Sequence, residues 1–527
     1  MSKDLCKNNR QVSQPDSSVS SALIPDTQAV SRFLEDVADQ ISYRPLRPAI
    51  QAELQDHIED RAAAYVSQGM SQEQARIQAV QDMGDAISIG TELNAAHQLC
   101  PCPGLLLLSA LMLGLGMLFS SFFQWSPEQS SGGFLYYLPG FLFFLLVVWK
   151  GYPLFVRHWR LPLLAAAAFL VLNLLGRFLA AHGLFYSRLL NNPGYQHFAR
   201  LLIAPVGILI LYRFRHTGKA LMTSVLGLAG FWLLFQMLCP DYGMQSASVA
   251  ALLSLFVTVC LLIRRDCFSF RKLRLYAVSL AAFLLMGSST VLSAPQYIQE
   301  FLFPDTRVHC TWDDSYNSIL IQDLLSRTPL LGGIQLTQAE LMDYGTGAWY
   351  FASRDPLQIG ISAVGLSSDQ EQAAFEAEVK RVQEAGGHPR YIHFTEETVT
   401  LWDILPQHYH NNYVIAVLIL QYGWAAGLAL CGVIALFYLL LFRCIRHIGG
   451  RLAYGLAMVC GQCLLWQTVL YILGNFGHQY ASFPTLPLVS EGRISLFFNM
   501  IFLGFLISAY RYHQVETEPI LGRRAPV

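Results

Sequence analysis

The sequence predicts an all-α polytopic membrane protein with about ten transmembrane helices, a small helical domain in front of them and a small α+β insertion between two of them. Hydrophobic residues fill 54% of the 527 positions and charged residues only 13%, whereas a soluble protein carries about a quarter charged residues. The charges are unevenly distributed, since only 1–99 and 304–412 look like water-exposed sequence. The rest of the chain is a series of apolar runs.

Ten of these runs approach or reach the length of a transmembrane helix, which needs about 20 apolar residues to cross the hydrocarbon core. They are 103–124, 134–156, 160–182, 198–214, 219–238, 246–263, 274–294, 413–442, 453–476 and 490–512. Each run is predicted to be one helix that spans the membrane.

Lysine and arginine accumulate in every second loop between these runs, and the other short loops hold almost none beyond Arg188. Positively charged loops stay in the cytosol. Both termini, including the tail 513–527, are therefore predicted to be cytosolic, and 295–412 extracytoplasmic. The basic loop and tail residues are Lys150, Arg157, Arg160, Arg213, Arg215, Lys219, Arg264, Arg265, Arg271, Lys272, Arg274, Arg443, Arg446, Arg451, Arg511, Arg523 and Arg524.

The remaining composition excludes several classes of protein. A net charge of −1 without a basic domain gives no sign of nucleic-acid binding. The 11 cysteines are scattered over both sides and the apolar runs, so no disulfide framework is predicted. No short apolar segment opens the chain, so a cleaved signal peptide is not expected.

The part in front of the spans divides into a polar segment, 1–26, which is predicted to be disordered, and a helical domain, 27–99. In the domain, apolar residues recur at helical spacing. Gly69 ends one helix, and Ser71 with Gln74 forms a capping box for the next.

Three stretches of this domain resemble the permease-prefix domain found ahead of some bacterial membrane proteins. They are Glu53-Leu54-Gln55-Asp56-His57-Ile58, Gly69-Met70-Ser71-Gln72-Glu73-Gln74-Ala75 and Met83-Gly84-Asp85. The resemblance implies that 27–99 contacts a cytosolic partner protein. The alternative is a passive folding cap.

The insertion 295–412 is predicted to have a core of its own. Residues 357–364 alternate like a strand, Ser368 can cap a helix with Phe375 and Val379 on its apolar face, and 391–394 could form a second strand. An insertion of this length favours a docking or lid element over a linker.

Four segments of the membrane domain stand out. They are His410-Asn411-Asn412-Tyr413-Val414-Ile415-Ala416-Val417 followed by Gly423 and Gly427; Leu486-Pro487-Leu488-Val489-Ser490-Glu491-Gly492; Pro240-Asp241-Tyr242-Gly243; and the run from Ser315-Tyr316 to Gly332-Gly333. All four follow the order of the motifs of the SEDS family, the FtsW, RodA and SpoVE proteins of cell division and cell shape. On these segments, residues 100–512 resemble a SEDS membrane domain.

The resemblance implies that the chain lies in the bacterial cytoplasmic membrane and takes part in peptidoglycan assembly. The family polymerises lipid II, an undecaprenyl-pyrophosphate precursor, beside a class B penicillin-binding protein. The implied glycosyltransferase chemistry needs a base for the acceptor hydroxyl, and a divalent cation could assist the departing pyrophosphate. No other cofactor is implied.

The position of the family's catalytic aspartate is Asn412, whose carboxamide cannot accept a proton near neutral pH. Glu491 is a candidate substitute acid, because an acid at a helix start in the interface needs a partner or water. The alternative is that Glu491 pairs with Arg493 or faces water. Further acids of the insertion are Asp313, Asp314, Glu396, Glu397 and Asp403.

Several polar residues near the extracytoplasmic ends of the spans are candidates for binding the precursor. Arginines inside a membrane are costly and suggest a function or a buried pair, and guanidinium groups suit a pyrophosphate. The candidates are Arg177, Arg200, Asp241, His410, Ser490 and Arg493. Snorkelling of the arginines to lipid phosphates is the alternative.

His408 and His410 lack a third ligand at suitable spacing, so no metal site is predicted.

Three functional hypotheses follow. The chain could be a divergent SEDS protein that binds lipid II, a non-catalytic scaffold or regulator of a cell-wall synthase complex, or a lipid or solute translocator. Polymerisation of lipid II separates the first two. The third needs a polar path through the bundle, and few charges lie in the inner halves of the spans.

Overall fold

The computed structural model describes residues 26–122, 137–158, 160–184, 193–238, 245–308, 313–354, 361–362, 391–392, 399–406, 409–481, 485–490 and 493–515, with single positions between 373 and 384. At some positions within these ranges only the backbone is described. The chain divides into two compact units, Met1–Leu99 and Cys100–Val527.

The first unit is a cluster of short helices. They are α1 (Asp26–Gln40), the 3-10 helix η1 (Arg44–Leu46), α2 (Arg47–Ser67), α3 (Gln72–Met83) and α4 (Ala86–Ala96). Val37, Ile41 and Ile58 are almost completely buried in its core, together with Ala75 and Ala79 of α3. Burying a valine or isoleucine side chain stabilises a fold by about 1.5–3 kcal/mol, so Val37, Ile41 and Ile58 hold the helices together.

Glycines and polar caps separate these helices. Gly69 and Gly84 both adopt a φ of +95°, which favours glycine because a Cβ would be strained there. The hydroxyl of Ser71 accepts a hydrogen bond from the Gln74 backbone N–H at the start of α3, which is one half of the capping box expected from the sequence. The Asp85 carboxylate caps α4 in the same way through Ser88.

The second unit is built around long apolar helices. They are α5 (Pro103–Phe122), α6 (Tyr137–Arg157), α7 (Arg160–Ala181), α8 (Pro193–Arg213), α9 (Gly218–Leu238), α10 (Gln245–Arg264), α11 (Lys272–Ser293), α20 (Trp424–Arg446), α21 (Arg451–Asn475) and α22 (Arg493–Tyr512). Within the described residues, eight are long and apolar enough to cross a membrane, and α5 and α7 contribute shorter apolar helices. The all-α polytopic fold class is confirmed.

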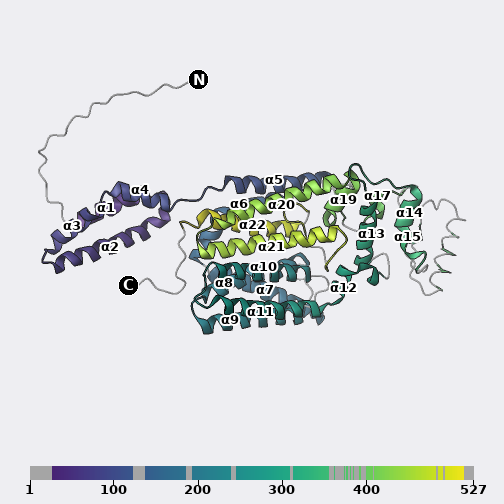
Figure 1. Ribbon diagram of the computed structural model, residues 1–527, viewed down its shortest axis with the longest axis horizontal. Helices are drawn as coiled ribbons and strands as arrows, with labels where there is room; N and C mark the ends of the chain where they lie inside the picture. The colour runs from purple at the N-terminus through teal and green to yellow at the C-terminus, as the bar shows by residue number, and fades with distance from the viewer. Residues whose placement is uncertain are drawn as a thin grey trace, which may run out of the picture. The chain divides into compact units, whose positions relative to one another are not determined.

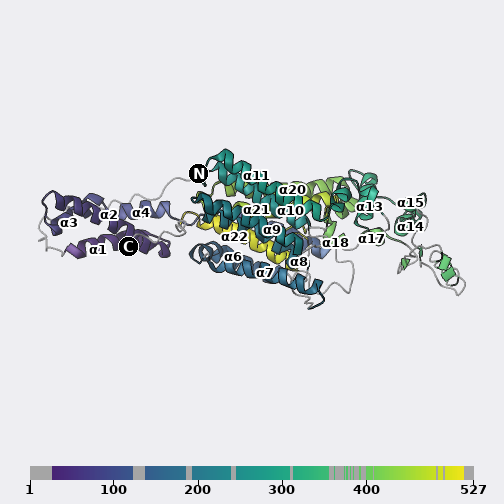
Figure 2. The same ribbon diagram turned by 90° about the horizontal axis from the view of Figure 1, so that it is seen from below.

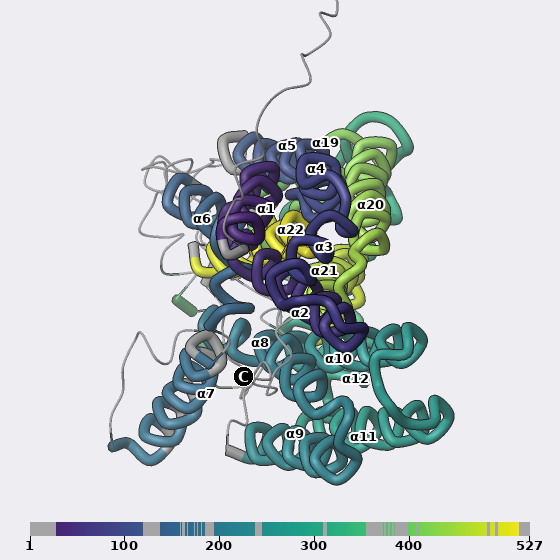
Figure 3. The backbone as a smooth tube through the Cα atoms, turned by 90° about the vertical axis from the view of Figure 1, so that its left-hand side faces the viewer, coloured from purple at the N-terminus to yellow at the C-terminus, as the bar shows by residue number. Residues whose placement is uncertain are grey.

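These helices run side by side along the long axis of the unit (Figures 1 and 2). Seen along the helices, α7, α8, α9, α10 and α11 gather on one side and α5, α6, α20, α21 and α22 on the other (Figure 3). In α8, α10 and α21, 67% of the most apolar stretch is buried, against 11% in α11. The core of the bundle therefore lies along α8, α10 and α21, and α11 presents its apolar surface outward.

One predicted span differs from the structure. The run 413–442 was predicted as one helix, but the chain forms a short α19 (Val414–Tyr422) and then α20, which begins at Trp424. Gly423, between them, has a φ of +94°, and a residue in that conformation cannot continue an α-helix.

The insertion joins the bundle at one end, which we call the insertion end; the opposite end, with the loops around 213–219, 264–274 and 443–451, is the basic end (Figure 1). The described elements of the insertion are α12 (Gln296–Leu302), η3 (Pro304–Arg307), α13 (Asp314–Arg327), α14 (Gln338–Thr346), α15 (Ala348–Phe351), β1 (Ile361–Ser362), β2 (Tyr391–Ile392), α17 (Leu401–Ile404) and α18 (Tyr409–Asn412).

Aromatic side chains pack the described part of the insertion. Tyr316 of α13 stacks on Phe351 of α15 with ring centroids 5.8 Å apart, and Trp349 donates a hydrogen bond to the Tyr316 hydroxyl. The strands β1 and β2 pair in parallel, with Ile361 opposite Tyr391. Most of the predicted α+β module lies outside the described residues, so its fold stays a prediction.

Candidate functional site at the insertion end

The segment around Asn412 is fixed to the end of α21 by hydrogen bonds. The Asn475 side chain donates to the Asn412 carbonyl (2.9 Å) and accepts from the backbone N–H groups of Ile415 and Ala416 (3.0 and 3.1 Å). The Tyr471 hydroxyl lies 2.9 Å from the Asn411 carbonyl and 3.0 Å from the Val414 N–H. The first backbone N–H groups of a helix have no partner inside it, so α21 provides the cap for α19.

A second motif segment holds the other end of α19. The loop after α13 forms four backbone hydrogen bonds of 2.8 to 3.1 Å with the α19–α20 junction, and these join Gly332 to Tyr422, Ile334 to Leu420, Pro329 to Trp424 and Leu330 to Ala425. A Cβ on Gly333 would lie 2.6 Å from the Gln421 carbonyl oxygen, and one on Gly423 would lie 2.7 Å from that of Leu330. The glycines of two separate motifs are therefore needed for one close backbone contact.

A chain of buried polar side chains runs inward from this segment. Gln467 of α21 is within 3.1 Å of His197 Nε2 on α8 and donates to Asn499 Oδ1 on α22 (3.3 Å). Asn499 donates in turn to Ser495 (3.3 Å). Gln467, Tyr471 and Asn475 are spaced by four residues, so they form a stripe on one face of α21 that extends about 12 Å.

Arg200 of α8 lies in this polar region and is only 2% exposed. Its guanidinium carbon is 5.1 Å from the ring centre of Phe235 on α9, a cation–π contact. One turn before Arg200, His197 forms the contact to Gln467. A buried cation in an apolar bundle is costly, and the neighbouring polar groups and the aromatic face offset part of that cost.

Several buried polar atoms of α8 and α10 have no hydrogen-bond partner among the described residues. They include Gln196 Nε2 on α8 and Gln245 Oε1 and Ser246 Oγ at the start of α10, the helix that packs against α8. Asn411 Oδ1, beside Asn412, is in the same state. Buried polar atoms are nearly always hydrogen-bonded, so these atoms are available to a bound polar group.

The segment that ends in Ser490 packs tightly on α5. A Cβ on Gly116 of α5 would overlap the Leu488 carbonyl oxygen. Leu488 itself has a φ of +69°, a conformation that costs a non-glycine residue about 1–3 kcal/mol and is held by its surroundings. The buried Ser490 hydroxyl donates to the Leu486 carbonyl (3.2 Å), which leaves its lone pairs for another partner.

The structure also brings an acid of the insertion next to the Asn412 segment. Asp314, at the start of α13, bonds to Gln479, and Gln479 accepts a hydrogen bond from the Tyr413 hydroxyl (3.3 Å). Partial burial of its carboxyl, together with the charge of Asp313, raises the pKa of Asp314 above its usual range, although the residue keeps contact with solvent. Asp314 is therefore a carboxylate whose proton affinity is increased beside Tyr413.

The predicted site residues differ in what the structure says of them. Arg200, Asn412 and Ser490 are described: Arg200 lies beside His197 on α8, Asn412 is bonded to Asn475 of α21, and Ser490 is bonded to Leu486. Arg177, His410 and Arg493 lie in α7, α18 and α22, but only their backbones are described. Asp241, Glu491 and His408 lie outside the described residues. Within the described ranges, no three His, Cys, Asp or Glu side chains are placed to hold a metal ion.

The polar stripe on α21 is not among the sites predicted from the sequence. Gln467, Tyr471 and Asn475 bind the Asn412 segment, His197 and Asn499, but none was singled out. A signal was present, because Gln462, Gln467 and Asn475 interrupt an otherwise apolar run, and polar side chains inside a membrane helix usually bond to another helix. The sequence did not show which helix.

The chain is similar to a curated protein over part of its sequence and to a solved structure. No model of a known protein family matches the chain. The probable peptidoglycan glycosyltransferase FtsW of Thioalkalivibrio sp. (strain K90mix) is 30% identical over 116 residues, which are 20% of this chain and 27% of that protein. The chain thus aligns with little more than a quarter of this relative.

A solved structure of a peptidoglycan synthase complex, described as coordinating polymerization and crosslinking, contains a chain that superposes with a TM-score of 0.46 at 17% identity. The superposition covers 78% of this chain and 97% of that one. The all-α polytopic fold itself follows from the eight described helices that are long and apolar enough to cross a membrane. This chain is therefore an all-α polytopic membrane protein that is similar to FtsW over 116 residues.

Proposed function

We propose that this chain acts in bacterial cell-wall assembly and binds an undecaprenyl-pyrophosphate precursor, lipid II, at the insertion end of the bundle. The observation that supports the proposal is the burial of Arg200 on α8 beside His197, which is joined through Gln467 of α21 to Asn499 of α22. A guanidinium group in an apolar bundle favours an anion as its neighbour.

The chemistry of the region suits such a ligand. A pyrophosphate presents several oxygens to one guanidinium, which binds them in a planar, two-pronged geometry. The free Gln196 Nε2 could donate to a further phosphate oxygen, and Gln245 Oε1 and Asn411 Oδ1 could accept from sugar hydroxyls. Each of these atoms would otherwise remain buried without a partner within the part of the chain that the structure describes.

The resemblance to the SEDS family supports catalysis less than it supports binding, because Asn412 stands where the family has its aspartate base. We therefore propose precursor binding as the primary activity and polymerisation only where another carboxylate takes the base role. Asp314 is our candidate for this role, because it lies beside Tyr413 and its pKa is raised. Without a base, the chain would act as a scaffold for a partner synthase, of which a class B penicillin-binding protein is the expected kind.

The test is binding of labelled lipid II to the full chain in lipid nanodiscs. We expect Arg200→Gln to weaken binding about tenfold or more, because a buried charge-assisted bond is lost. Arg200→Lys should have an intermediate effect, since lysine keeps the charge and loses the two-pronged geometry. Arg213→Gln, at the other end of α8, is the matched control and should bind like the unchanged chain.

Thermal unfolding of each variant separates loss of binding from loss of folding. Equal lipid II affinity in the unchanged chain and in folded Arg200→Gln would contradict the proposal. A polymerisation assay with and without a class B penicillin-binding protein then distinguishes the enzyme from the scaffold, because a scaffold changes only the product of its partner.

A further inference from the structure

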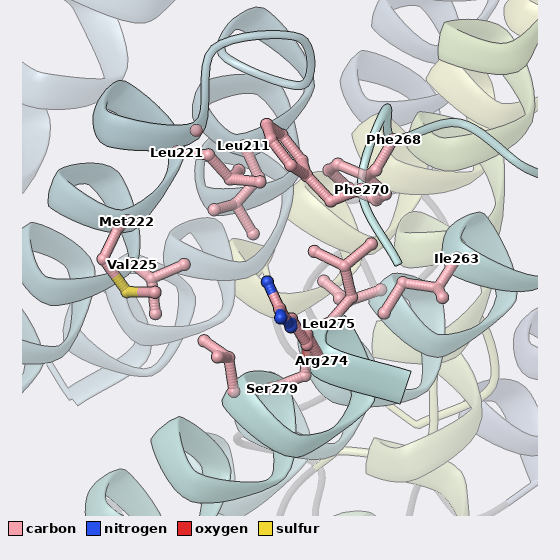
Figure 4. A pocket seen from close by; sticks show the side chains of 13 residues that line it. Leu211, Leu221, Met222, Val225, Ile263, Phe268, Phe270, Arg274, Leu275 and Ser279 are labelled. Atoms are coloured by element: carbon pink, nitrogen blue, oxygen red, sulfur yellow. The ribbon is translucent and has the colours of Figure 1, made fainter. Parts of the chain in front are cut away.

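The basic end of the bundle contains an open apolar cavity of about 170 Å³ between α8, α9, α10 and α11. Figure 4 shows apolar side chains around it, among them Leu221, Val225 and Leu275, with the guanidinium of Arg274 reaching into the space. Among the residues that line the cavity, Arg274 is charged, Ser279 is polar without a charge, and the others are apolar or glycine. The cavity is therefore apolar with a single cation.

A second, smaller cavity of about 50 Å³ continues the first along the same helices. We call the two cavities together the groove. The two share Leu211, Val225, Val259 and Ser279 in their linings, and the second extends to Met286. From Arg274 to Met286 is twelve residues of α11, or about 18 Å along the helix axis. This length is close to the thickness of one leaflet of the hydrocarbon core, about 15 Å.

The charges around the groove are not equally available. Lys272 pairs with Asp266 (2.8 Å), and Arg265 donates to the Ile448 and Arg446 carbonyls and stacks on Tyr454. Arg274 and Lys219 are exposed, and no ion pair or hydrogen bond within the described ranges engages either side chain. Arg274 therefore lines the apolar groove with no anion bound to it among the described residues.

We propose that this groove binds an anionic glycerophospholipid, with one acyl chain along α9 and α11 and the headgroup phosphate on Arg274. The basic loops place this end at the cytosolic leaflet, where anionic lipids are abundant and basic pockets between helices bind their headgroups. The groove has the length of an acyl chain in one leaflet, and its cation lies where a phosphate would be. This site is independent of the proposed precursor site at the insertion end.

The test uses the full chain purified in a mild detergent, with lipid binding followed by native mass spectrometry. The probes are phosphatidylglycerol and phosphatidylcholine, which differ in headgroup charge. We expect the unchanged chain to prefer phosphatidylglycerol by about tenfold or more, the size of a charge-assisted bond. Arg274→Gln should lose the preference. Arg271→Gln changes an exposed arginine of the same loop that does not line the groove, and should keep it.

A second variant tests the acyl groove rather than the headgroup. Ser279 lines both cavities, so Ser279→Phe should reduce binding of both lipids while the chain stays folded by thermal unfolding. Equal binding of the two lipids by the unchanged chain, or an unchanged preference in Arg274→Gln, would overturn the proposal. Retention of an isoprenoid lipid in place of a phospholipid after purification would overturn it as well.

Discussion

The two ends of the membrane unit use their polar residues in opposite ways. At the insertion end, Arg200, Gln467 and Asn475 are buried and join helices that are distant in the sequence. At the basic end, Arg274 and Lys219 are exposed around an apolar groove. A buried polar group must find a partner inside the protein or in a ligand, whereas an exposed cation can find one in the lipid headgroups. The burial of polar groups is thus the basis for the ligand proposed at the insertion end, and the exposure of cations is the basis for the lipid proposed at the basic end.

The largest expected effect tests whether the insertion end is a damaged catalytic site. Asn412→Asp introduces a carboxylate at the position that the resemblance to the SEDS family assigns to the base, and it should raise lipid II polymerisation by about 100-fold or more if the rest of the proposed site is intact. The measurement is the length distribution of glycan products from labelled lipid II. Asn411→Asp, one position away, is the control. If neither variant forms product and the chain still binds lipid II, the scaffold hypothesis is favoured.

The next effect tests whether buried polar side chains hold the insertion end together. Asn475→Leu removes the acceptor of two backbone N–H groups and should lower the free energy of unfolding by about 1–3 kcal/mol. Gln462→Leu changes another buried amide of α21, whose Oε1 has no partner among the described residues, and should be close to neutral. Thermal unfolding in nanodiscs measures both, and equal stability of the two variants would show that the cap on α19 contributes little.

The smallest expected effect is the loss of stability of α14 at low pH. Glu340 forms a capping box with Thr337 and pairs with Arg327, and the backbone N–H of Thr337, with the guanidinium, lowers the pKa of Glu340 from 4.5 to about 2. A lowered pKa stabilises the fold above the unfolded pKa near 4.5, and this contribution is lost as the pH falls toward about 2.

Hydrogen exchange of α14 should therefore accelerate between pH 4.5 and 2, after correction for the intrinsic rate, and Glu340→Gln should remove this step. The helices α9 and α11 contain no aspartate or glutamate, so they should show no such change. A step of the same size in α9 would mean that acid acts on the whole bundle rather than on this cap.

The sequence by itself determined the fold class, because a helix that crosses a membrane is a local property of about 20 consecutive apolar residues. The sequence also identified the segments around Asn412, Gly332 and Ser490 as motifs that resemble those of the SEDS family. It did not show that Gly423 ends one helix and begins another, since that break depends on the loop at Leu330 that packs against it.

Only the tertiary structure decided which of these segments meet. Asn475 and Asn412 are 63 positions apart, and the bond between them depends on how α21 is rotated against α19. The same rotation decides whether a polar residue such as Gln467 faces lipid or another helix. Apolar runs of similar composition are compatible with many such packings, because lipid tails are as apolar as the side chains that could replace them. The choice among them comes from a few polar contacts between distant residues.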